Sequence, residues 1–456
     1  MSRRDPLAEP VRFIDERTRS ARFSRRALRY VFPDHWSFLL GEVALYAFVV
    51  LVATGVYLAL FFEPSTAKTV YTGDYAPLRG VEMSAAYRSV VDLSLSVKAG
   101  LLMRQTHHWA ADLFVVAIVL HLLRVFFTGA FRRPRELTYA LGVLMLFVAL
   151  LEGYLGYSLV DDLLSGMGLA IGYSVAASVP VVGGNLALAI WGAPFPGDPQ
   201  FESRMYIAHV LLLPGLIAVL LTAHLALVAA RHHTQFAAGL PRPDRRLVGL
   251  PTFPAQAPRS LGLLAATAAL LFALGGLVQI NPVWLWGPYE TGLGTNGAQP
   301  DWYLGWLIGA LRLMPGFDVT IGDYTLVPNP FWGGVLFPTL ILVALLAWPW
   351  AERRLTGDHG PHNALDRPRD APLRTAVGLA VLTWVVLIFL AGSADRATVF
   401  LGLDYERLVH FYRVAVWVAP VIVFVLARRV CRELQRAEEV ERTRAAAEAE
   451  AELAAR

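Results

Sequence analysis

The chain is poor in cysteine and in charged residues. Its single cysteine, Cys431, among 456 residues excludes a disulfide framework, a four-cysteine zinc or iron–sulfur site and a Cys-x-x-Cys-His attachment motif. Charged residues make up 17% of the chain, whereas soluble domains are about one-quarter charged. Apolar residues reach 56%, which excludes disorder and most soluble folds. The net charge of +4 gives no indication of a nucleic-acid partner.

The sequence contains several long apolar runs. A helix rises about 1.5 Å per residue, so about 20 apolar residues cross a hydrocarbon core about 30 Å thick. Eight runs reach this length and predict an all-α, polytopic membrane protein. They are Trp36–Phe62, Trp109–Thr128, Leu137–Val160, Met205–Ala230, Ser260–Ile280, Phe331–Trp350, Thr375–Ser393 and Leu408–Ala427. The first run lacks a small-residue cleavage site, so we expect it to be a retained span.

The segments between the runs indicate orientation and a site. Lys and Arg accumulate on the cytoplasmic side of membrane proteins, and the arginine-rich segments here alternate with acidic ones along the chain. This pattern predicts that both termini are cytoplasmic. Residues 161–203 and 281–330 are long and rich in Gly, Pro and aromatic residues. Because long ordered loops usually carry function, we expect short surface helices there that cover a site on the outer face.

Four histidines share a regular spacing in the second and fourth runs. His107 and His121 are 14 residues apart, and His209 and His224 are 15 apart, so each pair returns to one helix face and is separated by about 21–22 Å along the axis. Both runs cross the membrane in the same direction, which pairs the histidines in two layers. A single intramembrane histidine can be a helix–helix hydrogen bond. Two layers of imidazole pairs are what bis-histidine ligation of two stacked hemes requires. His108 lies about 140° off this face and is assigned to helix packing.

Glycines in the first and third runs repeat the same spacing. Gly41 and Gly55 are 14 residues apart, and so are Gly142 and Gly156. Glycine costs about 1 kcal/mol inside a helix, so a repeated pair needs a reason. Close helix packing is the simple alternative. The match to the histidine spacing favours clearance for two flat macrocycles.

Two arginines lie close to the histidines. Arg104 is three residues before His107, and Arg124 is three residues after His121. Either side chain could extend to the membrane interface. We favour pairing with heme propionate carboxylates at the edges of the two layers, because an uncompensated arginine at this depth is costly.

Taken together, these features resemble the cytochrome b family of quinol:cytochrome c oxidoreductases. RQTHHWAADLFVVAIVLHLLRVFFTGAFRRPRELTY resembles the family's second helix and the following loop, GVLMLFVALLEGYLGYSL its third helix, and RMYIAHVLLLPGLIAVLLTAHL its fourth. QPDWYLGW at residues 299–306 resembles the family's motif at the outer quinol site. The resemblance extends from about residue 30 to residue 430 and is greatest to prokaryotic proteins of the actinobacterial type.

The resemblance implies two non-covalent hemes b and specific site residues. His107 and His209 would bind the low-potential heme iron, and His121 and His224 the high-potential heme iron. The quinol-oxidation motif corresponds to Pro300, Asp301, Trp302 and Tyr303. Asp301 is the expected first acceptor of a quinol proton, with Tyr303 beside it. Menaquinol is favoured over ubiquinol as the substrate.

The resemblance also implies domains, partners and location. We expect a cytoplasmic segment at 1–35, a di-heme four-helix domain at 36–240, a C-terminal transmembrane domain at 241–430 that carries the PDWY loop, and a charged cytoplasmic tail at 431–456. Because the chain has no cysteine framework, a Rieske iron–sulfur protein and a cytochrome c subunit are implied as partners. The family forms homodimers within the complex. The expected location is the plasma membrane of a prokaryote, in contact with lipid.

Two regions are less well defined. After GYSL the family commonly has Pro-Trp, whereas this chain has Val160, Asp161 and Asp162, so residue roles do not transfer there. For the inner quinone site, His35, His232 and His233 lie at a suitable depth, although each could simply anchor its helix at the interface.

Two other classes of protein remain as alternatives. A di-heme membrane anchor of a dehydrogenase would explain the histidines, but not the PDWY loop or the four further spans. A transporter could use intramembrane histidines as a proton relay, but it would not need the two glycine pairs and would bind no stoichiometric heme.

Overall fold

The computed structural model describes residue 13 and residues 15–18, 27–236, 247–294, 299–314 and 316–455. Most of the predicted segment 1–35 and the first residues of the predicted domain 241–430 lie outside the described residues. Within them, helices dominate, and eight are long and apolar enough to cross a membrane. The predicted all-α fold with eight spans is confirmed.

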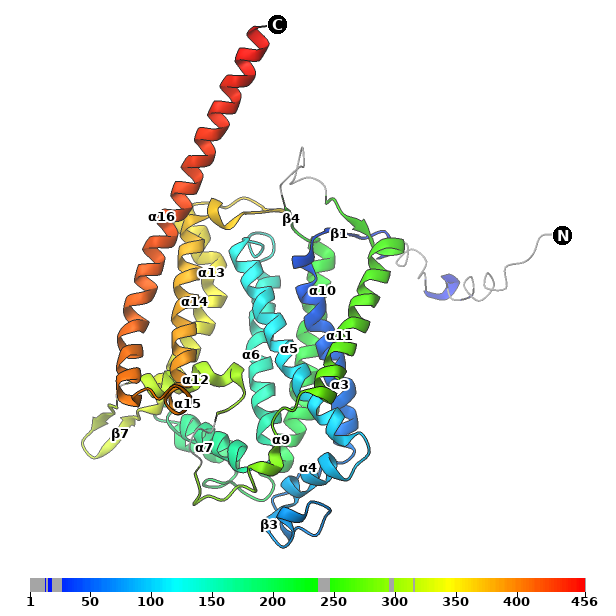
Figure 1. Ribbon diagram of the computed structural model, residues 1–456, viewed down its shortest axis with the longest axis vertical. Helices are drawn as coiled ribbons and strands as arrows, with labels where there is room; N and C mark the ends of the chain where they lie inside the picture. The colour runs from blue at the N-terminus through cyan, green and yellow to red at the C-terminus, as the bar shows by residue number, and fades with distance from the viewer. Residues whose placement is uncertain are drawn as a thin grey trace, which may run out of the picture.

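The eight long helices cover most of the predicted apolar runs and usually extend past them. They are Trp36–Ala59 (ending in α3, Leu40–Ala59), α5 (Gly100–Phe127), α6 (Glu136–Ser158), Phe201–Arg231 (α9, Phe201–Ile207, and α10, Leu213–Arg231), Thr252–Leu277 (ending in α11, Ala257–Leu277), Trp332–Thr356 (ending in α13, Phe337–Thr356), α14 (Pro372–Gly392) and α16 (Tyr405–Ala454). The largest extension is in α16, which continues far past the bundle (Figure 1).

Short elements connect the spans. The short α-helices are α4 (Ala85–Leu95), α7 (Leu163–Ala177), α8 (Gly183–Trp191), α12 (Gly305–Leu313) and α15 (Ala394–Leu401). Four two-stranded sheets pair β1 (Val31–Phe32) with β5 (Leu250–Pro251), β2 (Lys68–Val70) with β3 (Glu82–Ser84), β4 (Gln235–Phe236) with β8 (Ala364–Leu365), and β6 (Val319–Ile321) with β7 (Tyr324–Val327). The expected surface helices in 161–203 and 281–330 are therefore present as α7, α8 and α12.

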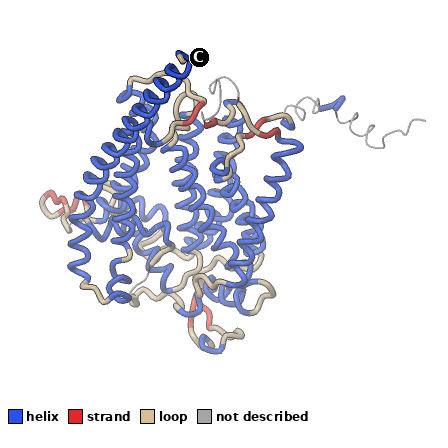
Figure 2. The backbone as a smooth tube through the Cα atoms, turned by 45° about the horizontal axis from the view of Figure 1, so that its top comes forward, coloured by secondary structure: helices blue, strands red, loops and turns tan. Residues whose placement is uncertain are grey.

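The long helices form two groups that lie side by side (Figures 1 and 2). In the first group, α3 packs along α5, and α6 packs along α10, with α11 against α5 and α3. In the second group, α14 packs along α16 and α12. Figure 1 shows α4, α7, α9 and the β2–β3 hairpin together at one end of the first group. This end corresponds to the predicted outer face.

Small side chains fill the centre of the first group. A buried cluster here consists of four alanines and two larger residues from neighbouring helices. They are Ala44, Ala47, Phe114, Ala117, Ala149 and Ile217. Burying apolar area contributes about 25 cal/mol per Å² in a soluble protein, but inside a bilayer close packing of small residues replaces this term. The helices therefore approach closely at mid-height.

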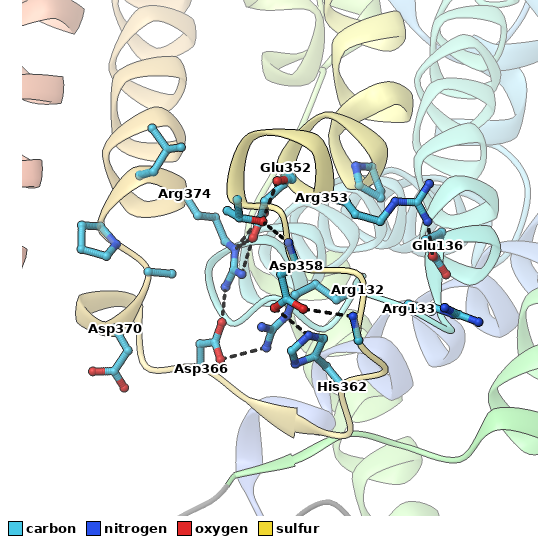
Figure 3. A pocket seen from close by; sticks show the side chains of 16 residues that line it. Arg132, Arg133, Glu136, Glu352, Arg353, Asp358, His362, Asp366, Asp370 and Arg374 are labelled. Atoms are coloured by element: carbon cyan, nitrogen blue, oxygen red, sulfur yellow. Dashed lines mark hydrogen bonds and ion pairs between the residues drawn. The ribbon is translucent and has the colours of Figure 1, made fainter.

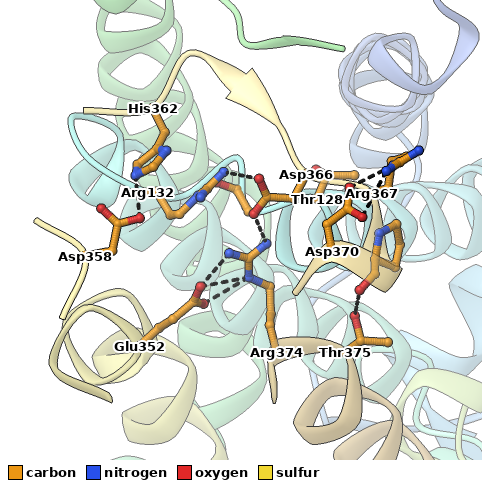
Figure 4. Close-up of polar contacts among 12 residues, drawn as sticks. Thr128, Arg132, Glu352, Asp358, His362, Asp366, Arg367, Asp370, Arg374 and Thr375 are labelled. Carbon is orange, nitrogen blue, oxygen red and sulfur yellow. Dashed lines mark hydrogen bonds and ion pairs between the residues drawn. The ribbon is translucent and has the colours of Figure 1, made fainter. Parts of the chain in front are cut away.

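A buried ion pair lies at the opposite end, where the C-terminal helices meet the turn between α5 and α6. The Arg374 guanidinium donates to both carboxylate oxygens of Glu352 at 2.5–3.0 Å and to Asp366 Oδ2 at 2.9 Å. Asp366 also pairs with Arg132 at 2.8 Å, in the turn between α5 and α6. Figure 4 shows Arg374 between its two carboxylates, and Figure 3 shows the cleft that these side chains line. Arg374 is 3% exposed, and its two carboxylate partners both belong to the C-terminal part of the chain. The contact with the first group is made by Asp366 through Arg132.

Gly129 gives the arginine its space. Its φ is +66°, and a Cβ there would lie 2.5 Å from Arg374 Nη1. Only a glycine allows both the backbone conformation and the close approach.

Candidate functional site

The histidines and glycines of the first group meet pairwise. A Cβ built on Gly55 would lie 3.2 Å from His107 Cε1, and one on Gly156 would lie 2.5 Å from His209 Cε1. At the other level, a Cβ on Gly41 would lie 3.4 Å from His121 Cε1, and one on Gly142 would lie 3.7 Å from His224 Cε1. Each of these four glycines of α3 and α6 therefore lies against one histidine ring of α5 or α10.

The outer pair of rings is spaced to hold one metal between them. The ring centres of His107 and His209 are 6.3 Å apart. An imidazole nitrogen lies about 2.0–2.1 Å from a bound transition metal, so two rings on opposite sides of one metal have centres about 6 Å apart. The observed distance fits this arrangement.

Hydrogen bonds indicate which ring nitrogen carries the proton in two of the histidines. His224 Nδ1 lies 2.9 Å from the carbonyl oxygen of Thr138, which can only accept, so this nitrogen carries the proton. The Thr54 hydroxyl donates to Val50 O at 2.7 Å, so its oxygen is free to accept from His107 Nδ1 at 3.0 Å. In both residues Nε2 is left as the unprotonated nitrogen, which is the usual arrangement for a metal ligand.

The other two histidines differ in their surroundings. His209 Nδ1 lies 2.9 Å from Glu152 Oε1, and Glu152 is in α6. His121 Nδ1 is buried and has no hydrogen-bond partner among the described residues. A carboxylate beside a ligating imidazole is a common way to orient its ring.

A π-helical turn explains the 15-residue spacing in the fourth span. Residues Ala208–Leu212 form this turn between α9 and α10, and the Leu213 amide donates to the Ala208 carbonyl five residues earlier. Such a turn accommodates one extra residue, so His209 and His224 are separated like two residues 14 apart in a regular α-helix. Pro214 follows directly and has no N–H to continue the regular pattern.

The two arginines next to the histidine layers have different partners. Arg124 Nε and Nη2 are buried without a hydrogen-bond partner among the described residues, and the guanidinium lies 4.0 Å from the Phe38 ring centre. Arg104 is 8% exposed; its Nε donates to Ser94 Oγ and its Nη2 to the Asn281 carbonyl, both at 3.0 Å. Two buried guanidinium nitrogens without partners are costly, so Arg124 fits a site that receives a carboxylate group.

The PDWY residues lie against α5 at its outer half. Asp301 Oδ1 lies 2.8 Å from His108 Nε2, and the Tyr303 hydroxyl donates to Asp301 Oδ2 at 2.9 Å. The indole of Trp302 donates to Asp112 Oδ1 at 2.8 Å. Burial and the Asp301 carboxylate hold the pKa of Tyr303 well above its usual value, so the phenol keeps its proton.

Sequence reasoning missed two members of this group, His108 and Asp112. Both point away from the face that carries His107, which is why His108 was assigned to helix packing. They are four residues apart in α5 and so lie on one face, and that spacing was the available signal. Their partners lie more than 180 residues further along the chain, since 193 residues separate His108 from Asp301.

The three candidate histidines for the inner quinone site gather near the inner layer. The Tyr30 hydroxyl lies 3.0 Å from His233 Nδ1, and Tyr30 stacks on His232 with ring centres 5.3 Å apart. Burial, together with Arg124 and Arg135, lowers the pKa of His233 to about 4. His35 has a structural part here, because its Nδ1 accepts from the Ser37 amide at 3.2 Å and caps the start of the first span.

Comparison with known proteins gives consistent matches. Residues 112–288 match the family model described as Cytochrome b(N-terminal)/b6/petB. The cytochrome bc1 complex cytochrome b subunit of Corynebacterium efficiens is 44% identical over 93% of this chain and 78% of its own length. The corresponding subunit of Mycobacterium bovis is 45% identical over 95% and 78%, and that of Streptomyces coelicolor 44% identical over 90% and 74%.

A solved structure supports the fold independently. A chain of a structure entitled Hyperthermophilic respiratory Complex III superposes with a TM-score of 0.65 at 22% identity, covering 91% of this chain and 99% of that chain. The fold therefore defines a polytopic, all-helical membrane protein whose first helix group brings four histidines against four glycines. With the identity to the actinobacterial subunits, the chain belongs to the cytochrome b family of the bc1 complex, in its actinobacterial branch.

Proposed function

We propose that this chain is the quinol-oxidising, di-heme subunit of a respiratory quinol:cytochrome c oxidoreductase. The observation that carries the proposal is the pairing of four histidine rings with four glycines in two layers. His107 and His209 would hold the outer heme b, and His121 and His224 the inner one. When bound, the two hemes would supply one-electron transfer across the membrane. The transporter alternative gives the four glycine contacts no purpose.

The protein's own groups account for the proton chemistry at the outer site. Asp301 is anchored by two donors, His108 and Tyr303, which fix the carboxylate in place. A quinol hydroxyl that binds beside it can transfer its proton to this carboxylate as its electrons leave. Trp302, held by Asp112, and Pro300 would form the wall of the pocket. Asp301 is one methylene shorter than glutamate, and its two anchors compensate by keeping it in position.

The remaining expectations are parts of the same proposal. A partner Rieske protein would take one electron, and a cytochrome c subunit would receive it. The second electron would reach an inner quinone site near His232 and His233, where protons are taken up from the cytoplasm. Menaquinol as substrate, cytoplasmic termini, the plasma membrane and a homodimer complete the proposal. Separating proton release from uptake across the membrane is what conserves energy.

Heme analysis tests the proposal directly. The purified complex is expected to contain two non-covalent hemes b per chain in a pyridine hemochrome assay, after the contribution of covalent heme in the partner cytochrome is resolved. Replacing His121 or His224 should remove the inner heme and leave the outer one at least partly bound. Retention of both hemes after either replacement, or absence of heme from folded protein, would refute the assignment.

Substitution at Asp301 tests the outer site. Asp301→Asn removes the proton acceptor and should lower quinol oxidation by roughly 100-fold or more, while both hemes remain bound. Asp301→Glu restores a carboxylate and should recover part of the rate. Asp323→Asn, in the exposed turn between β6 and β7, is the matched control and should behave like the unmodified protein. Equal rates for the two asparagine variants would contradict the role of Asp301.

A further inference from the structure

Glu152 is an acidic residue inside a membrane-spanning helix. After Glu136 at the start of α6, it is the only acidic or basic residue of that helix. Its side chain is 17% exposed, and its Oε2 has no hydrogen-bond partner among the described residues. Because a carboxylate within a membrane span is costly, we expect its position to serve a purpose.

The group nearest to this carboxylate is one of the four candidate heme ligands. Glu152 Oε1 lies 2.9 Å from His209 Nδ1. Glu152 precedes Gly156 by four residues, so the two share one face of α6. Gly156 is the residue that lets the His209 ring approach α6, and the π-helical turn that carries His209 packs against the same helix. The helix α6 therefore gives this ring both the space it needs and a carboxylate.

The other three candidate ligands have no charged partner at Nδ1. His107 Nδ1 lies 3.0 Å from a threonine hydroxyl, and His224 Nδ1 lies 2.9 Å from a backbone carbonyl oxygen. His121 Nδ1 has no hydrogen-bond partner in the described part of the chain. Within the described ranges, His209 alone of the four forms an ion-pair contact with a carboxylate. The outer and inner layers therefore differ in the charge beside a ligand.

Other charged groups close to the layers do not repeat this difference. Each layer has one nearby arginine with buried nitrogens, Arg104 at the outer level and Arg124 at the inner level. Glu42 follows Gly41 at the inner level, but its carboxylate accepts from the Ser260 hydroxyl of α11 at 2.8 Å. That contact directs it toward α11, and no contact joins it to a histidine ring among the described residues.

A carboxylate beside a ligating imidazole lowers the reduction potential of the bound metal. It raises the basicity of the imidazole, and negative charge favours the ferric state, which carries one more positive charge than the ferrous state. This effect needs charge and proximity rather than an aligned hydrogen bond, which His209 Nδ1 lacks among the described residues. At an effective dielectric constant of about 20, a unit charge within about 10 Å changes such an equilibrium by roughly tenfold.

We propose that the Glu152 carboxylate, through its contact with His209, lowers the reduction potential of the outer heme below that of the inner heme. The inference rests on the proposed binding of a heme by His107 and His209. One electron then moves from the outer heme to the inner heme, which oxidises the first and reduces the second. Glu152 is a positioning residue that favours this direction, and it takes no part in binding quinol.

A redox titration of the purified complex, followed through b-heme absorbance, measures both potentials. Glu152→Gln keeps the size of the side chain and removes its charge. At a fixed ambient potential it should shift the outer heme roughly tenfold toward the ferrous form, which is about 59 mV for one electron. The inner heme should not change and is the internal control. The His121 variant, which lacks the inner heme, identifies which transition belongs to the outer heme.

Two further comparisons separate charge from packing. Thr54→Val removes the neutral partner of His107 and should shift the outer heme by no more than about threefold. Glu152→Asp and Glu152→Asn match each other in size and differ in charge, so the outer heme should have the higher potential in Glu152→Asn. This pair decides the matter if Glu152→Gln fails to retain the outer heme.

Three outcomes would overturn the inference. They are an unchanged outer potential in Glu152→Gln, equal outer potentials in Glu152→Asp and Glu152→Asn, and a shift of the inner heme in place of the outer one. The unmodified complex separates this inference from the proposed function. If it contains no outer heme, the proposed function itself fails. If it contains both hemes and their potentials do not respond to the charge at position 152, only the role of Glu152 fails.

Discussion

Gly142 and Gly156 of α6 each lie against a histidine ring, but replacing them with alanine should have different effects on heme binding. A methyl group at position 156 would lie 2.5 Å from the His209 ring, whereas one at position 142 would lie 3.7 Å from the His224 ring. The second distance is ordinary contact. To bring the first from 2.5 to 3.4 Å, the His209 ring must withdraw by about 0.9 Å, which exceeds the roughly 0.5 Å that a metal site tolerates. Gly156→Ala should therefore lose most of its outer heme, while Gly142→Ala should keep both hemes.

The assay is heme content per chain with reduced-minus-oxidised spectra, on complexes purified in parallel. Alanine is favoured over glycine inside a helix by about 1 kcal/mol, so general destabilisation of α6 is not expected from either change. Thermal unfolding of the two variants checks that point. If Gly156→Ala retains both hemes with unchanged spectra, the contact between this glycine and His209 has no part in heme binding, and the clearance argument is wrong.

Three further changes test other parts of the structure. Arg374→Ala leaves Glu352 buried without its ion-pair partner and should lower the free energy of unfolding by about 3–5 kcal/mol, seen as a lower unfolding temperature. The exposed Arg436→Ala should lower it by no more than about 1 kcal/mol; similar effects of the two changes would contradict the role of the buried Arg374–Glu352 ion pair. The pKa of His233 is lowered to about 4, so its neutral ring contributes fully to the free energy of unfolding above the unfolded-state pKa of about 6.5. This contribution is lost as the pH falls toward 4. His233→Gln should therefore make the unfolding temperature less dependent on pH across that range. Tyr303→Phe removes one donor to Asp301 and should slow quinol oxidation with both hemes retained; an unchanged rate would argue against the anchor.

The periodic features of this chain could be predicted from sequence because a helix repeats at fixed intervals. Apolar length alone located the eight spans. The equal spacing of Gly41 and Gly55 with His107 and His121 placed glycines and imidazoles at matching heights, and the structure brings each of these glycines to one of the two rings. Such inferences need only the rise and rotation of single helices.

Contacts between distant segments could not be predicted in the same way. The meeting of His108 with Asp301 depends on how the loop after α11 folds back onto α5, and nothing local specifies that path. The 15-residue spacing of His209 and His224 did not by itself indicate a π-helical turn, because such a turn has no reliable signal in a single sequence beyond the nearby Pro214. The β2–β3 hairpin and α4 were also not expected between the first two spans.

The π-helical turn at Ala208–Leu212 also bears on how this helix tolerates insertions and deletions. In a regular helix, losing one residue rotates everything beyond it by about 100° and would turn a ligand away from its partner. Here the loss of one residue, for example the exposed Leu211, can be taken up by conversion of the π turn to an α turn. Homologous helices with histidines 14 or 15 residues apart can therefore present them in the same positions, and the helix can change length by one residue in evolution without passing through a form that has lost the site.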